Sequence, residues 1–97
     1  MNANEYINGM ADLIRTTGAD VRIEDIDGSK RIAAKFHSVS EMNSEMKKAF
    51  IANAETLKAL NAGLKALRAS GEIKSATNCW APTLLEGGIE LRMDFGF

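Results

Sequence analysis

Apolar residues recur at helical spacing in the first part of the chain. They fall on one face of a helix between residues 4 and 17. Asn2 or Asn4 can cap the start of this helix, and Gly18 can take the left-handed conformation that ends many helices. The sequence therefore predicts a short amphipathic helix, whose apolar residues are Tyr6, Ile7, Met10, Leu13 and Ile14.

An Asp27-Gly28 dipeptide separates two stretches in which apolar and polar residues alternate. This dipeptide is typical of a two-residue type I′ hairpin turn, in which both central residues have positive φ. The register set by such a turn places Ile23 opposite Ile32, with apolar pairs on one face and opposite charges on the other. The turn and the side chains thus agree on an antiparallel hairpin over residues 19–36.

A long helical pattern follows the hairpin. Ser38 and Glu41 fit a capping box at its start, and Gly71 supplies a stop after Ser70. A single helix over residues 39–70 would be about 45 Å long, whereas a compact chain of this length has a diameter of about 30 to 35 Å. Because the helix would be longer than its own domain, we expect its far half to lie along a second element or to be covered by another molecule.

Two strips of residues run along this expected helix. The first has the alternating three-and-four spacing of a coiled coil and is called the leucine seam; it contains Phe50, Asn53, Leu57, Leu60, Leu64 and Leu67. The second consists of small residues between positions 49 and 66. Both strips can serve one monomeric core, or one strip can meet its copy in a second molecule. We favour a homodimer whose interface contains Phe50, Leu57, Leu60, Leu64 and Leu67.

The last quarter of the chain returns to strand patterns. Residues 89–97 alternate between apolar and polar side chains and give the clearest strand in the sequence. Gly87 and Gly88 are expected to form the turn before it. Residues 72–77 alternate only weakly, and the segment 78–85 contains a proline, so we expect a loop or a short broken strand there.

The predicted elements follow the order α-β-β-α-β-β. This order indicates an α+β fold with an antiparallel sheet packed on one long central helix. With 97 residues, of which 45% are hydrophobic, the chain can form one core but not two, so residues 1–97 are expected to be a single domain. No apolar run approaches the roughly 18 residues of a membrane span, and the N-terminus does not look like a secretory signal. We therefore expect a cytoplasmic protein that does not bind membranes.

Candidates for catalytic chemistry are few. His37 and the single cysteine, Cys79, are the conventional base and nucleophile, but nothing in the sequence indicates that they meet. One cysteine cannot hold a zinc ion by itself, and the glycines match no phosphate-binding pattern. Trp80 is expected to anchor a turn in the core. The sequence thus predicts no enzyme activity, no metal and no cofactor.

The net charge of −1 hides an uneven distribution. Residues 1–27 carry six acids and two bases, whereas residues 28–70 carry eight bases and three acids. Because nucleic-acid-binding proteins gather bases on one face, an alternative function is nucleic-acid binding. The acidic pI of about 5.8 makes this the less favoured function. Its candidate contacts are Lys30, Arg31, Lys47, Lys48, Lys58 and Lys65.

A small chain with patchy charge and no catalytic signature is typical of regulators, adaptors and phage-type inhibitors of host machinery, such as anti-CRISPR proteins. We therefore expect a non-enzymatic protein that acts by binding another macromolecule. Its expected partners are a second copy of itself and an unidentified protein or protein complex.

Overall fold

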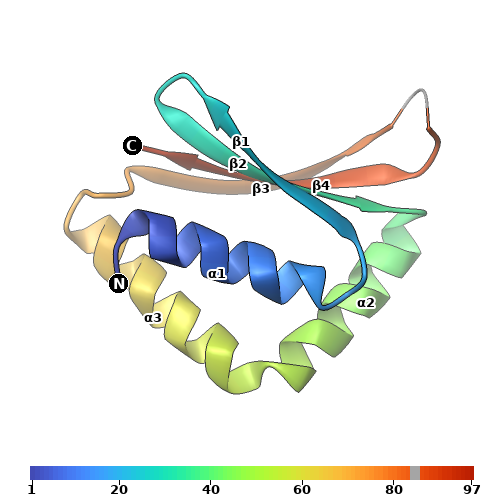
Figure 1. Ribbon diagram of the computed structural model, residues 1–97, viewed down its shortest axis with the longest axis horizontal. Helices are drawn as coiled ribbons and strands as arrows, with labels where there is room; N and C mark the ends of the chain where they lie inside the picture. The colour runs from blue at the N-terminus through green and yellow to red at the C-terminus, as the bar shows by residue number, and fades with distance from the viewer. Residues whose placement is uncertain (84–85) are drawn as a thin grey trace.

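The computed structural model of the chain describes residues 1–83 and 86–97, which form an α+β fold. The four strands make one antiparallel sheet in the order β1-β2-β4-β3, and the three helices lie on one side of it (Figure 1). Among the described residues, no helix combines the length and the apolar character needed to cross a membrane. In chain order the elements are α1 (Ala3–Arg15), β1 (Asp20–Ile26), β2 (Ser29–Phe36), α2 (Val39–Ala52), α3 (Ala54–Ala69), β3 (Ser75–Pro82) and β4 (Ile89–Gly96).

The predicted first helix is confirmed as α1. It begins with a capping box, in which the Asn2 side chain accepts a hydrogen bond from the Glu5 N–H at 2.8 Å and the Glu5 carboxylate accepts one from the Asn2 N–H at 3.0 Å. α1 lies against β1 and β2 on one side and against α3 on the other. Gly9 permits the close approach of α3, because a Cβ at this position would lie 2.9 Å from Leu60 Cδ2.

The predicted hairpin and its register are confirmed in β1 and β2, where Ile23 pairs with Ile32. The predicted type of turn is wrong. Gly28 has a φ of 75°, but no non-glycine residue in the described ranges has a positive φ. Positive φ at the second central residue alone is the pattern of a type II turn, and it spares Asp27 the steric cost of the left-handed conformation.

The prediction of one long central helix is wrong, because the segment forms two helices, α2 and α3, that meet at an angle at Asn53 (Figure 1). Asn53 leaves the helical conformation, with φ −118° and ψ 36°. Its Nδ2 donates hydrogen bonds to the Ala49 carbonyl at 2.9 Å and to Thr16 Oγ1 at 3.4 Å. An amide side chain that bonds the backbone favours a break in a helix. An unbroken helix of about 45 Å would be longer than the longest dimension of the molecule, which is 39 Å.

The C-terminal hairpin is longer than the sequence predicts. β3 pairs with β4 along its full length and ends at Pro82. The expected loop or short broken strand over residues 78–85 is therefore wrong for residues 78–82, which belong to β3. Residues 84 and 85 of that segment lie outside the described part of the chain. A proline is tolerated here because β3 is an edge strand. Gly87 and Gly88 both have positive φ, at 72° and 80°, as expected for the turn.

Candidate functional site

The inner face of the sheet, which is the face toward the helices, is covered unevenly. In the half formed by β1 and β2, the side chains of Val21, Ile32 and Ala34 are buried under α1. The row that contains Val21 and Ala34 continues across the ladder with Leu91 and Trp80. Leu91 is half-buried, and Trp80 is 49% exposed. In β4 the residues Ile89 and Phe95 are buried as well, so the part of the inner face that stays open consists of β3 and the middle of β4, at Leu91 and Met93. We call this part the open half of the inner face.

A groove of about 320 Å³ lies beside the open half, between α3 and the strands β3 and β4. α1 contributes Tyr6 and Met10 to its wall, and the Tyr6 ring packs edge-to-face on Phe95 with centroids 5.5 Å apart. Arg68 is the one charged residue in the lining, which contains no carboxylate among the described residues. We call this space the apolar groove; its other lining residues include Phe50, Leu57, Asn61, Leu64, Ala76 and Met93.

The structure divides the leucine seam between the core and the apolar groove. Leu60 and Leu67 are only 3% and 5% exposed and belong to the core. Phe50, Leu57 and Leu64 are half-buried and line the groove. A partner that docks on the seam would therefore meet these three residues, because Leu60 and Leu67 have almost no surface left to offer.

β3 forms one edge of the sheet, directly beside the apolar groove, and carries no charged residue. Proteins usually protect edge strands with charges, and β1 at the opposite edge carries four charged residues. Six of the eight residues of β3 are exposed. β3 thus leaves an unpaired backbone edge and uncharged side chains accessible.

Three bases of α3 lie along the mouth of the apolar groove. Asn61 and Arg68 line the groove, and Lys58 and Lys65 share their side of the helix because they are three or four residues away from them. None of these bases forms an ion pair with another described residue. We call Lys58, Lys65 and Arg68 the basic rim, and it places uncompensated positive charge next to an apolar surface.

The structure does not gather the six bases that the sequence offers as nucleic-acid contacts. Lys30 Nζ donates a hydrogen bond to Asn4 Oδ1 at 2.9 Å, and Arg31 pairs with Asp94 at 2.7 Å on the outer face of the sheet. The six bases occupy three separate places: Lys30 and Arg31 on β2, Lys47 and Lys48 on α2, and Lys58 and Lys65 on α3.

The outer face of the sheet is a network of paired charges. Glu90 is only 4% exposed and accepts hydrogen bonds from Arg22 Nη2 at 2.8 Å and from Arg92 Nε at 2.9 Å. Burial alone would raise the pKa of Glu90, but the hydrogen bonds from Arg92 and Arg22 outweigh it, so the pKa lies below its usual value. Because its arginines are compensated in this way, the outer face differs from the basic rim.

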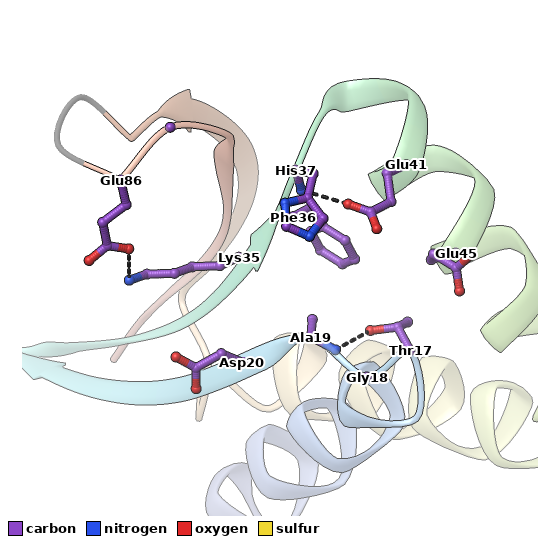
Figure 2. Close-up of a pocket in the computed structure, with 11 residues that line it drawn as sticks. Thr17, Gly18, Ala19, Asp20, Lys35, Phe36, His37, Glu41, Glu45 and Glu86 are labelled. Carbon is purple, nitrogen blue, oxygen red and sulfur yellow. Dashed lines mark hydrogen bonds and ion pairs between the residues drawn. The ribbon is translucent and has the colours of Figure 1, made fainter.

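A polar cavity of about 500 Å³ lies at the end of the sheet, where the start of α2 approaches the turn between β3 and β4 (Figure 2). Half of the predicted capping box is formed, because Ser38 Oγ accepts a hydrogen bond from the backbone N–H of Glu41 at 3.0 Å. The Glu41 carboxylate instead accepts one from the backbone N–H of His37, at 2.6 Å, and not from that of Ser38. Lys35 pairs with Glu86 on the facing wall. Cys79 does not line this cavity and lies exposed on β3. The structure therefore does not bring Cys79 to His37 at this cavity.

Comparison with protein-family models, with curated proteins and with solved structures found no match to this chain. Only the geometry and charge of the described residues therefore bear on its function.

Sequence reasoning misplaced Trp80 and missed Asn78 and Met93 as site residues. The expectation that Trp80 anchors a turn in the core is wrong, because β3 continues through this residue and leaves its side chain half exposed. The available signal was the alternation of Ala76, Asn78 and Trp80 on one face of a strand without charged residues.

Proposed function

We propose that this chain is a non-enzymatic protein that acts by binding another protein, as a regulator, an adaptor or an inhibitor. The observation that carries this proposal is the open half of the inner sheet face. There, Trp80 is 49% exposed beside the half-buried side chains of Leu91 and Met93. The apolar groove and the unprotected edge of β3 extend this surface on both sides.

The composition of the surface supports protein binding. Tryptophan, methionine and arginine are enriched at protein interfaces, and charges are depleted at interface centres. Trp80, Met93, Leu57 and Leu64 fit the centre, and Arg68 fits the rim. Full burial of an exposed large apolar side chain contributes about 1.5 to 3 kcal/mol. Because these four side chains are already about half-buried, docking would gain about 3 to 6 kcal/mol from them, which reaches only the lower part of an association cost of about 4 to 15 kcal/mol, so other contacts must supply the rest.

Affinity capture from a lysate of the source cell tests this proposal. We expect the double variant Leu57→Glu with Trp80→Ser to lose at least about tenfold of the captured partner, since both changes remove apolar surface from the interface. The control is Ile51→Ser, because Ile51 is 69% exposed and does not line the groove. Circular dichroism checks that both variants fold, and nuclease treatment separates protein partners from nucleic acid.

Two outcomes decide the matter. If the Ile51→Ser control still captures the partner and the Leu57→Glu with Trp80→Ser variant does not, the partner binds through this surface. Equal capture by the wild type and by both variants would contradict it.

The homodimer expected from the leucine seam stays a prediction, with a smaller set of residues to form it. Such a dimer would use Phe50, Leu57 and Leu64, because Leu60 and Leu67 are buried within the chain itself.

A further inference from the structure

We propose that the apolar groove receives an amphipathic α-helix of a partner protein, with acidic residues along the flank that faces α3. This inference rests on the proposed function and names the chemistry of the partner. It follows from three features of the described residues: the width of the open sheet face, the position of the groove between α3 and the sheet, and the charge of the basic rim.

The open half of the sheet has the width of one helix. Neighbouring strands lie about 4.7 to 4.9 Å apart, so β3 and the middle of β4, at Leu91 and Met93, together present a strip about 10 Å wide. A helix with its side chains is about 10 to 12 Å across. α1 already occupies the other half of the same face, against β1 and β2 (Figure 1). A second helix beside α1 would complete the layer.

The groove favours a helix over an added strand. A strand that pairs with the edge of β3 would extend the sheet outward and leave the space between α3 and β4 empty. A helix under β4 and β3 instead places its apolar side chains against Met93 and Trp80 of the sheet and against Leu57 and Leu64 of α3. This arrangement is the helix-in-groove mode of peptide recognition.

The basic rim selects an acidic helix. Lys58, Lys65 and Arg68 are without ion-pair partners in the described chain, and the groove lining has no carboxylate. Glutamates or aspartates on the docked helix would compensate these bases, whereas lysines would repel them.

A second copy of the chain is the less suitable occupant. A two-fold dimer places the same surface patch of both copies face to face. Both basic rims would then border the same interface, and neither would find a carboxylate among the groove residues of the other copy, because the described lining contains none.

Two synthetic helical peptides, each about three heptads long, test the proposal. Both carry leucine at the apolar positions; one carries glutamate along its flanks and the other carries lysine. Trp80 is the one tryptophan of the chain and lies beside the groove, two residues after Asn78 on the same face of β3, so its fluorescence reports a helix that covers the groove and the open half together. We expect the glutamate peptide to bind saturably at micromolar concentration and to shift the Trp80 emission to shorter wavelength. The lysine peptide should bind at least about fivefold more weakly, as a few exposed ion pairs imply.

A charge-reversed variant sharpens the test. Lys65→Glu with Arg68→Glu should reverse the preference toward the lysine peptide. The control, Arg15→Glu with Lys48→Glu, changes the net charge equally at residues that do not line the groove, and it should keep the preference of the wild type.

Equal binding of the two peptides, or no binding of either, would overturn the helix proposal. If the peptides fail while capture from the lysate still depends on Leu57 and Trp80, the helix proposal alone is rejected. If the wild type and the Leu57→Glu with Trp80→Ser variant also capture the same amount of partner from the lysate, the proposed function is rejected with it. A doubled mass together with no peptide binding would assign the groove to a second copy.

Discussion

Asn53 decides how the middle of the chain folds. Its side chain joins the end of α2 to Thr16, in the turn between α1 and β1, and it bonds the last turn of α2 at the Ala49 carbonyl. We expect Asn53→Ala to lower the free energy of unfolding by about 1 kcal/mol, because it removes these hydrogen bonds from a residue that is not helical.

The control for this change is Asn43→Ala. Asn43 is exposed on α2, and alanine is the better helix former, so its replacement should leave stability unchanged or raise it slightly. Urea denaturation measures both variants. Equal stability of the two would show that the Asn53 side chain does not hold the bend.

The bend could not be predicted from the sequence, although Asn53 was visible as a polar residue in the leucine seam. A buried asparagine that sets the register of a coiled coil has the same spacing as one that breaks the helix. The deciding partner, Thr16, is 37 residues away along the chain, and no local pattern indicates this contact.

The helix α3 has two kinds of leucine, which should respond differently to truncation. Leu60 is buried against α1, so Leu60→Ala should lower the free energy of unfolding by about 2 to 5 kcal/mol. Leu57 borders the apolar groove, and its truncation should cost about 1 kcal/mol because one side of the residue already faces water. Chemical denaturation at neutral pH measures the difference. Equal losses would mean that the groove does not exist as described.

Elements that depend on turn residues and on the alternation of apolar and polar side chains could be predicted from the sequence. The turn at Gly28 and the alternation on both sides of it determine the β1–β2 register, and the structure confirms it. The strand β3 was underestimated because its alternation is weak, and it pairs with β4 only through contacts formed in the folded chain. Which half of the sheet α1 covers is likewise a tertiary property.

The whole molecule is asymmetric, and this asymmetry supports the proposed binding surface. Its outer sheet face carries charges that are paired with one another, as around Glu90. On its inner face, α1 packs against β1 and β2, and α2 contacts β2. Because α2 and α3 diverge at Asn53, β3 and the middle of β4 stay open (Figure 1). The part left open is apolar and is bordered by the basic rim. This combination favours a partner with complementary apolar and acidic surface.

Quenching of Trp80 fluorescence by acrylamide in the free protein, from low to high protein concentration, tests whether this face is open. With Trp80 49% exposed, we predict emission typical of a tryptophan in water and ready quenching at every concentration. Protection that appears only at high concentration would mean that a second copy covers the face. Short-wavelength emission with little quenching at all concentrations would contradict an open face, and with it binding of a partner protein at this site.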